Sequence, residues 1–77
     1  MSNEITNEWL ESLAFFHARG TPESYLTIHT NGYTLETFDD GYKRQWWLNG
    51  ARVHPMPLSR KDVKNLLERL RRVNDRT

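Results

Sequence analysis

The sequence predicts a small α+β domain of the order α-β-β-β-β-α, with both helices packed on one face of a four-stranded antiparallel meander. Three turn signals of the Asn-Gly or Asp-Gly type divide the middle of the chain, at Asn31-Gly32, Asp40-Gly41 and Asn49-Gly50. One apolar stripe at helical spacing precedes these turns, and a second follows them. Because such dipeptides favour two-residue hairpins, successive strands between them should pair as antiparallel neighbours.

The three turns also predict the register of the sheet. If each is a two-residue hairpin, Ile28 lies opposite Leu35, Leu35 opposite Trp46, and Trp46 opposite Val53. These four side chains then form one apolar row, which a shift of one residue would scatter onto both faces. The predicted strands span about residues 24–30, 33–39, 42–48 and 51–54.

The neighbouring tryptophans of the third strand should point to opposite faces, because side chains alternate along a strand. Trp46 belongs to the apolar row and is predicted to be buried beneath the helices. Trp47 belongs to the other face, where aromatic and cationic side chains gather. Two helices are about wide enough to cover one face of four strands. The chain then has nothing left to cover the face that carries Trp47.

The first helix is predicted at about residues 4–18, where apolar side chains recur at helical spacing. Ser2 or Asn3 could cap its start. Phe15 lies outside the apolar stripe and is predicted to be partly exposed. The stripe consists of Ile5, Trp9, Leu13 and Phe16.

The second helix is predicted at about residues 60–73. Ser59 and Asp62 stand at the spacing of a capping box, with Asp in place of the usual Glu. Pro55 and Pro57 should end the last strand before it, since proline cannot donate to a sheet ladder. Its apolar stripe consists of Val63, Leu66, Leu67, Leu70 and Val73.

Length and composition favour one domain over residues 1–77, in the cytoplasm. The 77 residues include no cysteine, which excludes disulfides and thiolate metal sites and fits a reducing compartment. No apolar run approaches the ~20 residues of a membrane span, and the acidic start does not resemble a signal peptide. The net charge is only +1, but residues 59–77 carry seven Lys or Arg side chains against three acids.

The pattern of reactive residues does not favour an enzyme. No metalloprotease, phosphate-loop or serine-hydrolase motif occurs. His29 and His54 are predicted on outer strands about 14 Å apart, too far to share a metal, and His17 is predicted on the first helix. Asp39 and Asp40 precede a glycine, as is typical of a hairpin turn. We therefore expect no catalytic residues, metal or cofactor.

The uncovered sheet face is the first candidate for a working surface. Trp47 is predicted opposite Arg52, which permits a cation–π contact. Aromatic residues and arginine dominate protein interfaces. We therefore expect a small non-enzymatic protein-binding module, an inhibitor or adaptor in the style of those that phages and mobile elements encode. The predicted protein-binding residues are Tyr25, His29, Phe38, Lys43, Trp47 and Arg52.

The alternative partner is nucleic acid. The stretch Ser59-Arg-Lys-Asp-Val-Lys-Asn65 resembles the basic start of the last helix in double-stranded-RNA-binding domains, and the helix–sheet–helix order is similar. The glycine-rich approach to that helix, the longer loop between the first two strands and a three-stranded sheet are missing. The resemblance implies a strip of cations that binds backbone phosphates. A DNA-binding regulator would need the same strip. The aromatic face could in addition stack unpaired bases. The residues of this alternative are Arg60, Lys61, Lys64, Arg69 and Arg72.

The first strand is a predicted edge of the sheet, and the other sheet face is predicted to be bare. Both features permit a homodimer as well. Nothing in the pattern indicates a membrane partner.

Overall fold

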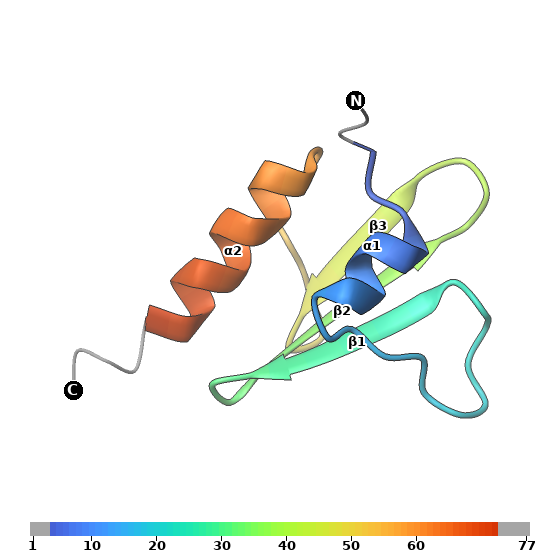
Figure 1. Ribbon diagram of the computed structural model, residues 1–77, viewed down its shortest axis with the longest axis horizontal. Coiled ribbons are helices and arrows are strands. Elements are labelled where there is room, and N and C mark those ends of the chain that lie inside the picture. Colours follow the sequence, from blue (N-terminus) through green and yellow to red (C-terminus); the bar gives the residue numbers. More distant parts are fainter. Residues whose placement is uncertain (1–3, 73–77) are drawn as a thin grey trace.

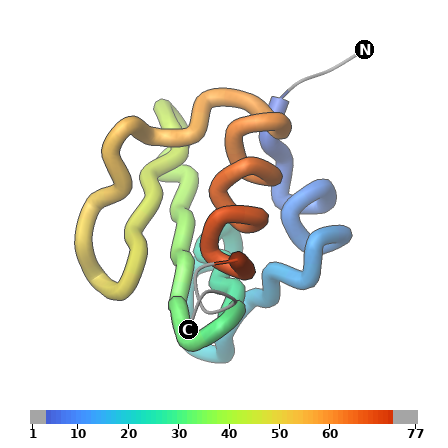
Figure 2. The backbone as a smooth tube through the Cα atoms, turned by 90° about the vertical axis from the view of Figure 1, so that its left-hand side faces the viewer, coloured from blue at the N-terminus to red at the C-terminus, as the bar shows by residue number. Residues whose placement is uncertain are grey.

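Alternating apolar side chains and tight turns produce one four-stranded antiparallel sheet with the order β1-β2-β3-β4. The computed structural model describes residues 4–72. The predicted fold class and element order are confirmed, and both helices lie on the same side of the sheet (Figures 1 and 2). The elements are α1 (Asn7–Ser12), β1 (Tyr25–Thr30), β2 (Tyr33–Asp39), β3 (Arg44–Leu48), β4 (Ala51–Arg52) and α2 (Arg60–Arg72).

The first and third hairpins have the predicted two-residue turns. Asn31 has a φ of 53° and Asn49 a φ of 49°, and each is followed by a glycine that also has positive φ. Both central residues of a type I′ turn need this conformation. Ile28 therefore lies opposite Leu35, as predicted. The predicted pairing of β3 with the last strand is also confirmed, although β4 ends at Arg52 and not at residue 54.

The middle turn differs from the prediction, because it is a four-residue loop over residues 40–43. The Asp40 carboxylate accepts hydrogen bonds from the backbone N–H groups of Tyr42 (2.8 Å) and Lys43 (3.1 Å). These bonds hold the longer loop, and β3 begins at Arg44, which pairs with Asp39. Leu35 consequently lies opposite Leu48, so the predicted pairing of Leu35 with Trp46 was wrong by two residues. A shift of two keeps every side chain on its face, so the predicted core survives.

The first helix is much shorter than the predicted span of residues 4–18. It begins after Thr6, whose Oγ1 accepts a hydrogen bond from the Trp9 N–H at 3.1 Å. The predicted caps Ser2 and Asn3 lie outside the described residues. The helix ends at Ser12, and Ala14 then adopts a left-handed φ of 84° that redirects the chain.

The chain beyond this break runs extended along the edge of β1. Phe16 and Thr27 exchange two backbone hydrogen bonds, of 2.8 Å and 2.9 Å. The free edge of β1 thus gains partners that a continued helix could not provide. Extended backbone points Phe15 inward, where it is 3% exposed, and Phe16 outward, where it is 44% exposed. The predicted exposure of Phe15 and burial of Phe16 were therefore both wrong.

The core lies between the helices and one sheet face. Trp46 is its largest side chain and is 1% exposed, with the ring of Phe15 edge-on at 6.2 Å. α2 follows the predicted boundaries, although Val73 lies outside the described residues. Within residues 4–72, neither helix has the length and apolar character needed to cross a membrane. The buried apolar residues are Leu10, Phe15, Leu26, Ile28, Leu35, Trp46, Val63, Leu66, Leu67 and Leu70.

Polar contacts hold both ends of α2. The Asp62 N–H donates to Ser59 Oγ at 3.2 Å, as the predicted capping box requires. The Asp62 carboxylate accepts from the Leu58 N–H at 3.1 Å, one residue earlier than a regular box would have it. At the other end, the Asn31 side-chain amide donates to the carbonyl of Leu70 at 2.8 Å. The β1–β2 turn therefore caps the last turn of the helix (Figure 2).

A polar cluster around Arg44 joins α1 to the sheet. The half-buried guanidinium donates to Asn7 Oδ1 at 2.7 Å and to Thr37 Oγ1 at 3.4 Å. It also lies 3.9 Å from the Asp39 carboxylate. Burial lowers the pKa of Arg44, and the charge of Asp39 opposes that effect. The cluster closes the end of the core near the β2–β3 loop.

Candidate docking face of the sheet

The sheet surface that points away from the helices, here the outer face, collects most of the predicted protein-binding residues. One row crosses it, because Phe16, Thr27, Glu36, Trp47 and Arg52 are successive cross-strand partners. Partners in antiparallel strands point to the same side of the sheet. Alternation along β1 and β2 adds Tyr25, His29 and Phe38 to this side.

Three rings and one guanidinium form a connected cluster on this face. The Tyr25 ring lies 6.1 Å from that of Phe38 and 6.4 Å from that of Trp47, the latter nearly parallel at 22°. The Arg52 guanidinium lies over the indole of Trp47 at 5.9 Å. The predicted contact between Trp47 and Arg52 is therefore confirmed. Rings at these separations attract one another beyond their buried area.

Glu36 occupies the centre of the cluster. Its Oε2 accepts a hydrogen bond from the Tyr25 hydroxyl at 2.6 Å. This bond and partial burial raise the pKa of Tyr25 above its ordinary 10.0. Within residues 4–72 the structure shows no Lys, Arg or His within ion-pair distance of the carboxylate. The sequence places Glu36 on this face, but the predicted site did not include it.

One edge of the outer face is extended by Phe16, which sequence reasoning missed. Its ring lies 5.6 Å from that of His29, and His29 Nδ1 lies 3.0 Å from Thr34 Oγ1. The residue escaped notice because its spacing fits the apolar stripe of the predicted first helix. The left-handed turn at Ala14 that moves it has no signal in the sequence, since alanine rarely adopts that conformation.

Lys43 does not join the cluster, contrary to its predicted place on the third strand. It lies in the β2–β3 loop and is exposed, because β3 begins one residue later. The other five predicted protein-binding residues lie on the outer face. The structure thus brings together Tyr25, His29, Phe38, Trp47 and Arg52, and adds Phe16 and Glu36.

The predicted nucleic-acid strip on α2 is only partly free. The Arg60 guanidinium lies over the Trp9 ring at 5.1 Å, and its Nε donates to the Glu4 carbonyl at 2.7 Å. Arg72 forms an ion pair of 3.5 Å with Glu68. Three cations of the predicted set stay exposed without an ion pair to another described residue: Lys61, Lys64 and Arg69.

No group of three or more His, Cys, Asp or Glu side chains that could hold a metal ion occurs in the described part of the chain. Comparison of the chain with protein-family models, with curated proteins and with solved structures gave no significant match. The geometry of the outer face is therefore the basis for a proposed function.

Proposed function

We propose that the protein is a non-enzymatic binding module that docks another protein on its outer face. The cluster of Tyr25, Phe38 and Trp47 carries this proposal, because no helix of the described chain covers it. These rings are half-buried, and aromatic rings and arginine are the groups that contribute most to protein–protein affinity. An inhibitor or adaptor working in the cytoplasm would need little more than such a face.

The rings are already held in place before any partner arrives. Tyr25 is held by its bond to Glu36 and by the rings of Phe38 and Trp47, and Trp47 is held by Tyr25 and Arg52. Ordering a free side chain at an interface costs roughly 0.5–1.5 kcal/mol. The cluster avoids much of that cost, which favours binding over a merely solvated sheet surface.

The charge pattern indicates which partner surface would fit. The Glu36 carboxylate lies among the rings with the neutral Tyr25 hydroxyl as its hydrogen-bond donor. A partner lysine or arginine placed there would meet a carboxylate flanked by the rings of Tyr25 and Trp47. We therefore infer that the partner presents a basic side chain surrounded by apolar groups.

A pull-down from cell lysate tests this function. Immobilised wild type is compared with Trp47→Ala and with Tyr42→Ala, a matched control because Tyr42 is 98% exposed in the β2–β3 loop. We expect wild type and Tyr42→Ala to capture the same partner and Trp47→Ala to lose it. Circular dichroism confirms that each variant is folded. Retention of the partner by folded Trp47→Ala would exclude the outer face as the docking surface.

A nucleic-acid partner is the second candidate function. It is favoured by the exposed side chains of Lys61, Lys64 and Arg69, which form no ion pair with another described residue. The β1–β2 connection is only the turn Asn31-Gly32, too short to reach a minor groove as in double-stranded-RNA-binding domains. The form of nucleic-acid binding that fits the structure is contact between these cations and the backbone phosphates, without insertion into a groove.

Fluorescence titration separates the two candidates. Labelled duplex RNA, duplex DNA and single-stranded RNA are titrated at two salt concentrations with wild type and with the double variant Lys61→Glu/Lys64→Glu. Micromolar binding that weakens steeply with salt and is lost in the double variant would support the nucleic-acid function. Absence of such binding would leave the outer face as the working surface.

A further inference from the structure

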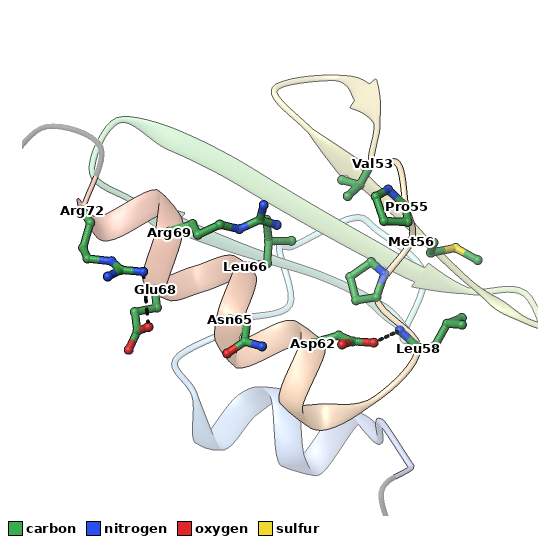
Figure 3. A pocket seen from close by; sticks show the side chains of 11 residues that line it. Val53, Pro55, Met56, Leu58, Asp62, Asn65, Leu66, Glu68, Arg69 and Arg72 are labelled. Atoms are coloured by element: carbon green, nitrogen blue, oxygen red, sulfur yellow. Dashed lines mark hydrogen bonds and ion pairs between the residues drawn. The ribbon is translucent and has the colours of Figure 1, made fainter.

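A second surface lies on the helix side of the sheet, where α2 does not close onto the β3–β4 hairpin. A groove of about 450 Å³ separates them. Its walls are apolar, with Leu48 and Val53 on the sheet side and Leu66 and Leu70 on the helix side. Val53, Leu66 and Arg69 also line a neighbouring hollow of about 560 Å³, which continues the groove toward the segment at residues 55–58 (Figure 3).

One side of this groove is the edge of the sheet. β4 is the last strand, and Val53 uses its N–H to bond the Trp46 carbonyl of β3 at 3.2 Å. Hydrogen-bonding direction alternates along an antiparallel strand, so the backbone N–H and C=O groups of Arg52 point away from β3. An edge that offers N–H and C=O groups can accept another strand.

The charges at the groove have a single sign. The cations Arg52 and Arg69 line the 450 Å³ groove beside His54, and no carboxylate of the described residues does. Figure 3 shows the Arg69 side chain extending from α2 past Leu66 in the neighbouring hollow, which Asp62 and Glu68 also line. Within residues 4–72, Arg69 forms no ion pair.

We propose that this groove binds an extended acidic segment of another protein, which adds to the sheet as a strand beside β4. Alternation would direct every second side chain toward Val53 and Leu66, where apolar residues fit. The intervening side chains would lie beside Arg52, where Glu or Asp fits. Arg69 lies on the helix side of the groove, so it would attract these carboxylates through its charge at longer range. The complement is thus a segment of alternating apolar and acidic residues.

A second copy of this chain is a poorer occupant than such a peptide. Two β4 edges paired about a two-fold axis would bring the Arg52 side chains of the two protomers close together. Like charges directly opposite in a sheet are destabilising. The charge of the groove therefore favours a partner of opposite sign.

Nuclear magnetic resonance with defined peptides tests the proposal. The labelled full chain is titrated with acetylated, amidated (Glu-Val)₄ and with (Lys-Val)₄ as the matched control. We expect only (Glu-Val)₄ to shift the amide signals of Arg52 and His54. Arg69→Glu should weaken its binding about tenfold, whereas Lys64→Glu, on the same helix outside the groove, should weaken it much less.

Backbone pairing is tested by methylating the peptide nitrogens. Two versions of (Glu-Val)₄ carry N-methyl groups either on all Glu or on all Val residues, whose N–H groups point to opposite edges of a strand. If the peptide adds to β4, one version keeps its affinity and the other loses it.

Several results would overturn the proposal. One is that (Glu-Val)₄ does not bind, or that the two peptides bind equally. Another is that Arg69→Glu and Lys64→Glu lose the same affinity. The last is that the two methylated versions bind equally. Sedimentation would show whether the chain dimerises, and a dimer abolished by Arg69→Glu would assign the groove to a second copy instead. Arg52 belongs to both surfaces, but Arg69 lines the groove and is not part of the outer-face cluster, so Arg69→Glu tests this proposal separately from the outer-face function.

Discussion

The neighbouring residues Trp46 and Trp47 have the same side chain and opposite environments. Trp46 is 1% exposed and packs against Phe15, and its indole Nε1 has no hydrogen-bond partner among the described residues. Trp47 is half-buried, between the ring of Tyr25 and the guanidinium of Arg52. The helices thus cover one indole completely, while the other is supported only from its sides.

This contrast shows that the two faces of the sheet meet different physical demands. On the inner face, large side chains fill the core, even though the unpaired Nε1–H of Trp46 costs about 1–3 kcal/mol. The outer face is arranged by ring geometry and charge, around Glu36 and Tyr25. Inner-face substitutions should therefore change the free energy of unfolding, and outer-face substitutions should mainly change binding.

The largest expected effect is on stability at position 46. Trp46→Ala should lower the free energy of unfolding by about 3–5 kcal/mol, because it leaves a cavity in the core. Trp47→Ala should cost only about 1 kcal/mol, since it removes ring and cation contacts at a surface that water already reaches. Urea unfolding followed by circular dichroism measures both. Equal losses at the two positions would mean that the outer face belongs to the folding core.

The alternation that separates the two tryptophans was the most predictable feature of the molecule. Asn31 and Asn49 precede glycines in turns whose geometry requires positive φ, so they fixed the pairing of Ile28 with Leu35 and of Leu48 with Ala51. Which face a strand side chain occupies depends only on whether its position in the strand is odd or even. The two-residue error at the middle turn therefore did not move any side chain to the other face.

The features that could not be predicted depend on competition between local and tertiary contacts. Asp40 binds two backbone N–H groups ahead of it, and this side-chain bonding lengthens a turn that an Asp-Gly pair alone suggests is tight. Phe16 leaves the first helix because the edge of β1 offers it two hydrogen bonds. Helical spacing and turn dipeptides cannot reveal either outcome, and for that reason the prediction put Phe16 in the first helix and Lys43 on the third strand.

An intermediate effect on stability is expected at Arg44, a half-buried cation at the end of the core. Arg44→Ala should lower the free energy of unfolding by about 1.5–3 kcal/mol, because Asn7 and Thr37 lose a charged hydrogen-bond partner. Lys64→Ala, at an exposed position of α2, should change it by less than about 0.5 kcal/mol.

A double-mutant cycle with Asn7→Ala sharpens that result. If the hydrogen bond between Asn7 and Arg44 stabilises the fold, the double variant should lose less stability than the sum of the losses in the two single variants. Strict additivity would show that Arg44 stabilises the fold through its other contacts, to Thr37 and Asp39.

The smallest effect concerns the hydrogen bond at the centre of the outer face. The folded state raises the pKa of Tyr25 above 10.0, because the phenol donates to the Glu36 carboxylate. A raised pKa means that the folded chain keeps a proton that the unfolded chain releases. The resulting stability is fully present below pH 10.0 and is lost as the pH rises through the folded pKa.

Tyr25→Phe removes this pH-dependent contribution. The variant should be less stable than wild type by at most about 1 kcal/mol below pH 10, and the difference should shrink in more alkaline solution. Urea unfolding of both proteins across that range measures it, and Glu36→Gln should lower the pKa of Tyr25 toward 10.0 in an absorbance titration. A stability difference that stayed constant through the alkaline range would mean that Tyr25 contributes its ring alone. The outer face would then be ordered by stacking, without help from its central carboxylate.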